Sequence, residues 1–188
     1  MGSVHSFEDR AVARLRARLG AAEEANQDLI AFARGHHGTV SAIHRAVLAV
    51  MESPNLAALT GTVTHDWPAV LNIDHCALAF PHEQGALHAT RDSVGFLDPV
   101  ILSRAAAALP PVTVRDVARG HPLFGPACAT VRAEALVRID LASGDRGLLL
   151  LGQCRSPGLA DCGGNELLRF LGQSLAAMIG RWRTGADS

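Results

Sequence analysis

The chain has 188 residues, of which 48% are hydrophobic and 19% are charged, so it can build one compact domain with a sizeable core and an added helical segment. The formal net charge of −1 gives no general attraction to nucleic acid or to an anionic membrane. No secretory signal and no uninterrupted apolar run of about 18 residues is present, so we expect a cytoplasmic protein without a membrane-spanning helix.

The composition also limits the chemistry that the side chains offer. All 17 basic side chains are arginines and the chain is rich in alanine, which points to a GC-rich bacterial genome rather than to phosphate recognition. Of the four cysteines, Cys76 and Cys128 lie among apolar residues and are expected to be buried free thiols. Cys154 and Cys162 flank a loop and could pair under oxidation, although nothing indicates export to an oxidising compartment.

The first helical signal is a heptad repeat between residues 8 and 50. The a positions are Val12, Leu19, Asn26, Ala33, Val40 and Val47, and the d positions are Leu15, Ala22, Leu29, His36, Ile43 and Val50. A sustained a/d repeat is typical of a coiled coil, in which a polar residue such as Asn26 at an a position can fix the register of a parallel dimer. We therefore expect a helical dimerisation segment at residues 1–50, followed by a folded domain at 51–188. The expected interface residues are Val12, Leu15, Leu19, Asn26 and Leu29.

An amphipathic helix that packs on its own domain would show nearly the same stripe, and this alternative stays open. The segment 35–38, with the sequence Gly-His-His-Gly, interrupts the repeat, because two glycines cost a helix about 2 kcal/mol relative to alanine. A break is therefore expected between a helix that ends near Arg34 and a second one from about Thr39 to Met51. The adjacent histidines point about 100° apart on a helix, so they cannot chelate one metal ion.

Residues 53–117 are expected to form short helices and strands. Residues 56–71 are predicted to be helical, with one face formed by Leu56, Leu59, Val63 and Trp67. Alternation at 74–80 predicts a strand with Cys76, Leu78 and Phe80 on one face, and a turn at 81–85 leads to a second strand at 86–90. A helix is expected at 98–109, capped by Asp98 and begun by Pro99, before a third strand at 112–117.

Residues 121–182 are the most apolar part of the chain. A helical turn at 121–130 precedes a long hairpin, whose strands at 133–141 and 147–153 are joined by a polar turn. The run from Leu148 to Leu151 is entirely apolar, which indicates a central strand covered on both faces. A closing helix is predicted at 167–182, with an apolar face formed by Leu167, Leu168, Leu171, Leu175, Met178 and Ile179. Two hairpins with short connections predict an α+β fold, with a mostly antiparallel sheet of about five or six strands and helices on its faces.

A set of structural motifs extends over most of the chain. They are Asn26-x-x-Leu29-x-x-x-Ala33-Arg34, then Leu123-Phe124-Gly125-x-Ala127 before Val131-Arg132-x-x-Ala135-Leu136, then Gly147-Leu-Leu-Leu-Leu-Gly152 and Gly164-x-x-Leu167-Leu-x-Phe170-Leu171. This set, within residues 12–183, resembles the DUF484 family of bacterial proteins of unknown function with a GAF-like domain. The resemblance implies a GAF-like sheet and a long N-terminal helix for dimerisation. Family members often have serine after the second glycine of their G-L-L-x-L-G-S motif, where this chain has Gln153.

The sequence contains no catalytic motif, and we expect no enzyme activity. There is no G-x-S-x-G elbow and no P-loop, and His75 and Cys76 point to opposite faces of a strand, so they form no dyad. A metal site built from His82, Glu83 and His88 around the first hairpin is a weaker interpretation than ordinary exposed hairpin residues. No metal and no cofactor are therefore expected.

A small-molecule pocket is the more natural interpretation. The resemblance implies a ligand held between one sheet face and the segments that cross it, here 91–98 and 119–128, since such pockets combine apolar walls with a few polar groups. The candidate lining residues are Phe80, Arg91, Phe96, His121, Phe124 and Cys128.

The function that we expect is a non-catalytic GAF-like regulatory or sensor module. It is expected to be a homodimer with a small-molecule ligand of unknown identity, and to contact neither nucleic acid nor membrane directly. The alternative is a protein-interaction adaptor with a vestigial pocket that recruits a partner such as a DNA-processing enzyme. The resemblance supports this alternative, since in some relatives the gene lies near that of a tyrosine recombinase.

Overall fold

The computed structural model describes residues 23, 38–155 and 164–184, and the compact unit begins at Thr39. Its centre is a six-stranded sheet with the order β3-β2-β1-β6-β5-β4, in which every neighbouring pair is antiparallel. The strands are β1 (His75–His82), β2 (Gly85–Ala89), β3 (Val94–Leu97), β4 (Val112–Asp116), β5 (Ala133–Asp140) and β6 (Arg146–Gln153). The predicted α+β class and antiparallel sheet are confirmed.

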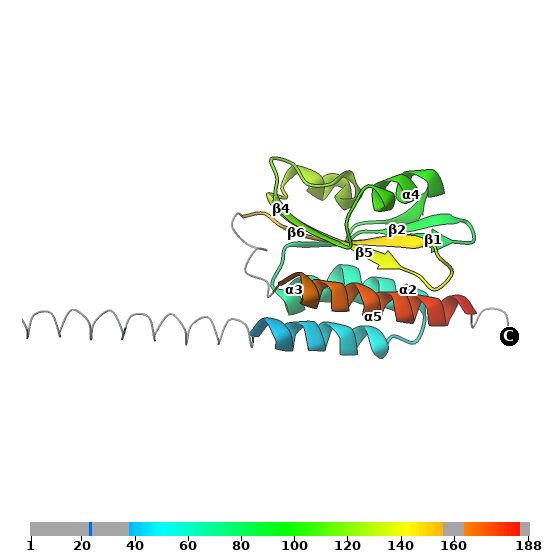
Figure 1. The fold of residues 1–188 in the computed structure, drawn as a ribbon, viewed down its shortest axis with the longest axis horizontal. Helices are drawn as coiled ribbons and strands as arrows, with labels where there is room; N and C mark the ends of the chain where they lie inside the picture. The colour runs from blue at the N-terminus through cyan, green and yellow to red at the C-terminus, as the bar shows by residue number, and fades with distance from the viewer. Residues whose placement is uncertain (1–22, 24–37, 156–163, 185–188) are drawn as a thin grey trace, which may run out of the picture. The chain divides into compact units, whose positions relative to one another are not determined.

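Helical elements cover both faces of the sheet (Figure 1). One face carries a helix at residues 39–51 together with α2 (Leu56–Gly61), the π-helical turn η1 (Thr62–Asp66), α3 (Trp67–Leu71) and α5 (Gly164–Thr184). The other face carries α4 (Pro99–Ala107) and the 3-10 segment η2 (Pro122–Ala129). Within the described residues, no helix is both long enough and apolar enough to cross a membrane.

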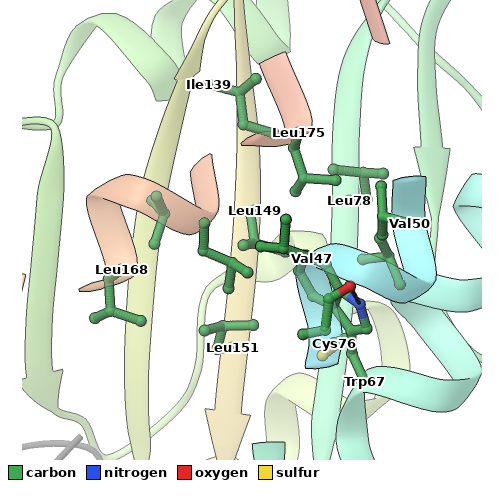
Figure 2. Packing of buried hydrophobic residues seen from close by; sticks show 14 of the residues in the cluster. Val47, Val50, Trp67, Cys76, Leu78, Ile139, Leu149, Leu151, Leu168 and Leu175 are labelled. Carbon is green, nitrogen blue, oxygen red and sulfur yellow. Dashed lines mark hydrogen bonds between the residues drawn. The ribbon is translucent and has the colours of Figure 1, made fainter. Parts of the chain in front are cut away.

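The core on the α5 face follows the apolar pattern of the sequence (Figure 2). Cys76, Leu78 and Phe80 alternate along β1 and all belong to this core, which they share with residues of η1, α3 and α5. Trp67 is completely buried, and its indole Nε1–H donates a hydrogen bond of 3.0 Å to the Ala46 carbonyl. This bond ties α3 to the helix at 39–51.

The helix at 39–51 uses its stripe to pack on its own domain. Ile43, Ala46, Val47 and Val50 are buried in the same core as α5 and β1. For these residues, the apolar stripe is that of an amphipathic helix packing on its own domain, as the alternative interpretation stated. The expected domain boundary at residue 50 therefore falls after a helix that already belongs to the compact unit.

The rest of the heptad prediction concerns residues outside the described part of the chain. These are the expected interface residues Val12, Leu15, Leu19, Asn26 and Leu29, and residues 35–37 of the helix break expected at 35–38; the last residue of that segment, Gly38, is described and is helical. Dimerisation through this segment stays a prediction.

Strand β3 is an element that we did not expect. We predicted that residues 91–98 cross a sheet face, but Val94 pairs with Ala89 of β2 and Phe96 pairs with Leu87. The alternation is short and lies at the sheet edge, where Val94 is 65% and Phe96 50% exposed. Such a half-open strand lacks the apolar run by which a central strand is recognised.

Side chains cap the starts of α2 and α4, and the cap predicted at Asp98 is confirmed. The Asn55 side chain accepts a hydrogen bond of 2.8 Å from Ala58 N at the start of α2. The Asp98 carboxylate accepts one of 2.8 Å from Val100 N at the start of α4, where Pro99 is the first helical residue. Both caps satisfy backbone N–H groups that have no partner inside the helix.

Candidate functional site

The sheet face under η2 is filled by the protein's own side chains. Small residues on the strands, Ala77 and Ala79, leave room for the ring of Phe124, which is 2% exposed. A Cβ on Gly152 would lie 3.0 Å from two atoms of that ring, so glycine at this position allows the ring to reach β6. Close packing of this kind leaves little room for a ligand behind Phe124.

A buried carboxylate anchors η2 to the sheet. Glu134 on β5 is completely buried, and its Oε1 accepts from Arg115 on β4, from Nη2 at 2.7 Å and from Nε at 2.8 Å. Its Oε2 accepts a hydrogen bond of 2.7 Å from the backbone N of His121. The register pairs Arg115 with Glu134, so the ion pair lies across adjacent strands.

The imidazole of His121 caps η2. Its Nδ1 lies 3.2 Å from Leu123 N, which donates to it. Burial lowers the pKa of His121; the negative charge of Glu134 opposes this shift and the positive charge of Arg115 adds to it. A neutral ring with a free lone pair on Nδ1 is the form that the cap requires.

A cleft of about 270 Å³ lies on the same sheet face, beyond η2, between α4, the β1–β2 hairpin and the β5–β6 turn. Its residues are Pro81, Ala86, Pro99, Leu102, Ser103, Ala107, Gly144, Asp145 and Arg146. The walls from the hairpin and α4 are mostly apolar, and the polar groups are concentrated on the turn. Arg146 is about half exposed, and its Nε lies 3.6 Å from Asp140 Oδ1.

Three of the six predicted lining residues come together on η2 or at its start. His121, Phe124 and Cys128 all belong to this segment, and Cys128 Sγ accepts a hydrogen bond of 3.5 Å from Arg119 Nη2. Phe124 and Cys128 share one buried cluster. A role in ligand binding for these three residues stays a prediction.

The other three predicted residues lie elsewhere. Phe80 is buried on the opposite sheet face, in the core with α5, because it shares the phase of Cys76 and Leu78 on β1. Arg91 is exposed in the turn before β3. Phe96 lies on the sheet edge, with its ring centroid 5.4 Å from that of His82. The six residues therefore do not share one wall, and none of them lines the 270 Å³ cleft.

Sequence reasoning missed the Glu134 anchor and the cleft. Glu134 did carry a signal, since it is a charged residue in an otherwise apolar stretch of β5, opposite in phase to the residues that face α5. Charged residues are almost never fully buried unless they are paired. The cleft carried no such signal, because Leu102, Ala86 and Arg146 come from three segments that only the fold brings together.

The histidines of the first hairpin do not converge. His88 Nε2 lies 2.7 Å from the Leu123 carbonyl, to which it donates, whereas His82 contacts Phe96. The register pairs His88 with Ala79, which faces η2, while His82 has the phase of Phe80, which faces α5. Among the residues that the structure describes, no three His, Cys, Asp or Glu side chains are placed to hold a metal ion.

A comparison with protein families decides the relationship that the motifs suggested. The profile of DUF484, a protein family of unknown function, matches residues 1–184. The chain belongs to the DUF484 family. No curated protein sequence matches this DUF484 chain.

Solved structures show the same fold as this DUF484 protein. The GAF domain of a phosphoenolpyruvate-protein phosphotransferase from Coxiella burnetii is 15% identical, with a TM-score of 0.55, over 81% of this chain and 99% of that chain. The GAF domain of a putative sensor histidine kinase from Pseudomonas syringae pv. tomato is 15% identical, with a TM-score of 0.50, over 88% and 96%. A far-red-absorbing dark-state structure with bound biliverdin is 16% identical, with a TM-score of 0.52, over 76% and 99%. At these identities the likeness establishes a GAF-like fold and leaves function to the site.

Proposed function

We propose that this DUF484 protein is a non-catalytic regulatory or sensor module that binds a small molecule in the cleft between α4 and the β5–β6 turn. The cleft is the observation that carries the proposal. Its volume of about 270 Å³ is near the lower end of ligand sites, so it suits a metabolite of modest size. Apolar walls from Leu102 and Pro81 would hold the body of the ligand, while Ser103 and Arg146 offer polar groups to orient it.

Binding would act on α4 and the β5–β6 turn, because both contribute to the cleft. A ligand shifts a conformational equilibrium only by the difference between its affinities for the two states. We propose that the protein is a cytoplasmic homodimer and that its two conformational states differ in the packing of the N-terminal helical segment. The fold shared with solved GAF domains supports the sensor role. The homodimer is inferred from the heptad pattern alone.

Native mass spectrometry of the protein purified from its own host tests the ligand directly. The proposal expects a retained small molecule, which the Ala107→Trp variant should lose because Ala107 lines the cleft. Ala108→Trp is the matched control, since Ala108 is an exposed neighbour that does not line the cleft. If both variants keep the molecule, it binds elsewhere. If the wild type retains none and no metabolite shifts its thermal unfolding, the sensor proposal fails.

Sedimentation of full-length variants tests the dimer. Glutamate in place of Leu15 or Leu29, two d positions, should give monomers at concentrations where the wild type is dimeric. Ala17→Glu is the matched control, because position 17 lies opposite the a/d stripe. Dimers that survive the Leu15 and Leu29 substitutions would show that the heptad is not the interface.

Exposed apolar side chains on two helices favour the adaptor as a second candidate function. The helix at 39–51 exposes Leu48 (56%) and Met51 (55%), and Phe170 on α5 is also exposed. Leu48 and Met51 lie three positions apart and so share one face of this helix, and an exposed apolar face is typical of a protein interface. The adaptor would use such residues to recruit a protein partner, for instance a DNA-processing enzyme. The Leu48→Glu variant would then lose the partner without losing stability, whereas a sensor would keep its ligand in this variant.

A further inference from the structure

A cysteine and a histidine meet at the other end of the β1–β6 strand pair, away from the cleft. His75 is the first residue of β1 and pairs with Gly152, and Cys154 follows the end of β6. Cys154 Sγ lies 3.6 Å from His75 Nε2, within hydrogen-bond reach for sulfur. Asp74 Oδ2 accepts a hydrogen bond of 2.7 Å from Cys154 N, which fixes the backbone that presents the thiol.

Thr130 also lies near this ring nitrogen but does not compete with Cys154 as a donor to it. Thr130 Oγ1 lies 3.4 Å from the same His75 Nε2, but it donates its own proton to the Ala127 carbonyl at the shorter distance of 2.9 Å. Because the Thr130 hydroxyl already donates elsewhere, the Nε2 lone pair of a neutral His75 ring stays available to the Cys154 thiol, whose proton it can accept.

Cys154 differs from the other cysteines that the structure describes. Cys76 is 3% and Cys128 is 8% exposed, whereas Cys154 is partly open to solvent. Burial raises the pKa of the Cys76 thiol, which keeps it protonated and unreactive. Reactive cysteines are partly exposed and lie beside a group that takes their proton.

We propose that Cys154 is a thiol modification site for low-molecular-weight disulfides, with His75 as the base. The Cys154 proton passes to His75 Nε2, and the thiolate attacks one sulfur of the disulfide. A new bond forms between Cys154 Sγ and that sulfur while the original S–S bond breaks, and the departing thiolate takes the proton back from His75. The products are a mixed disulfide on Cys154 and one free small thiol, so no outside oxidant or reductant is needed.

The full-length protein with Cys162→Ser is the background for the test, so that Cys154 cannot pass its modification to that residue. The protein is exposed to bis(2-hydroxyethyl) disulfide at pH 7, quenched in acid and digested with trypsin. Because every basic residue is arginine, the three remaining cysteines fall in separate peptides, 46–91, 120–132 and 147–155. The peptide 147–155 should be modified first, and the other two should stay free while the protein is folded.

Replacing His75 by glutamine should slow the modification of Cys154 about fivefold. Without a base, a cysteine is only a few per cent thiolate at pH 7, so the rate should fall. The fall is limited because a thiolate that forms more readily is also a weaker nucleophile. His82→Gln is the matched control on the other end of β1 and should leave the rate unchanged. Continued protection of the peptides 46–91 and 120–132 shows that each variant is folded. An unchanged rate in the His75 variant, or faster modification of Cys76 or Cys128 than of Cys154, would overturn the proposal.

Discussion

Replacing Arg115 by glutamine should destabilise the domain more than replacing its partner Glu134 by glutamine. The asymmetry comes from burial, since the Glu134 side chain is fully buried whereas the Arg115 side chain is 48% exposed. Without Arg115, a carboxylate remains in the interior with the His121 backbone N–H as its other donor. Without the charge of Glu134, the guanidinium can turn to water, and glutamine still accepts from His121.

The expected magnitudes follow from these environments. Breaking a fully buried pair costs about 3–5 kcal/mol when a charge is left behind, and solvent near Arg115 should reduce this to about 2–3 kcal/mol for Arg115→Gln. Glu134→Gln exchanges charge-assisted hydrogen bonds for neutral ones and should cost about 1 kcal/mol. The double variant should also cost about 1 kcal/mol, because it leaves no stranded charge.

Urea unfolding of the four proteins, with a common m-value, measures these free energies of unfolding. Each kcal/mol should also shift the melting temperature by about 2–4 °C for a domain of this size. Equal costs for the two single variants would refute the argument from burial. A double variant that is less stable than the Arg115 variant would refute it as well.

Three further changes should affect stability in ways that the structure specifies. Gly152→Ala should cost about 1–3 kcal/mol in thermal unfolding, because its Cβ would press on the Phe124 ring at 3.0 Å. Trp67→Phe should cost about 2 kcal/mol in urea unfolding, through the lost bond to the Ala46 carbonyl and a small cavity. Burial lowers the pKa of His121, so the unfolded chain binds a proton at this histidine more readily than the folded chain does. The wild type should therefore lose stability as the pH falls below the ordinary histidine pKa of 6.5. The His121→Asn variant should lose less stability over the same pH range.

Each of these variants has a control or a contrary outcome. Gly95→Ala is the control for Gly152, since no atom lies within 4 Å of its added Cβ, and an equal loss at both positions would point to β propensity instead. For Trp67, a cost below about 0.5 kcal/mol would show that the helix at 39–51 is not held by this side chain. For His121, the difference between wild type and variant isolates one histidine among nine, and a flat difference from pH 7.5 to 5 would contradict the shift.

The fold was largely predictable because its core repeats simple patterns. The apolar run from Leu148 to Leu151 correctly indicated a strand covered on both faces, since Leu149 and Leu151 belong to the core on the α5 side while Leu148 and Leu150 belong to the core on the side of α4 and η2. Alternation along β1 likewise gave the correct inward face. β3 escaped prediction because an edge strand has one open side and no apolar run to mark it.

The site was less predictable, because its parts come from distant segments. Phe80 and Phe124 both looked like pocket walls, but the phase of β1 sends Phe80 to the α5 side. His75 and Cys76 were correctly excluded as a dyad by strand geometry. The neighbour that His75 does find, Cys154, lies 79 positions away and becomes visible only through the pairing of β1 with β6.

The order of the strands sets a condition on how the chain can fold during synthesis. β1 leaves the ribosome with β2 and β3, but its inner edge stays unpaired until β6 emerges, because His75 pairs with Gly152 and Ala79 with Leu148. Pairings of such long sequence separation are slow to form, and open strand edges attract other chains. A chain interrupted before residue 146 would therefore present a bare, apolar strand from the middle of the sheet. Aggregation or degradation, rather than a stable half-domain, is the expected fate of such a fragment.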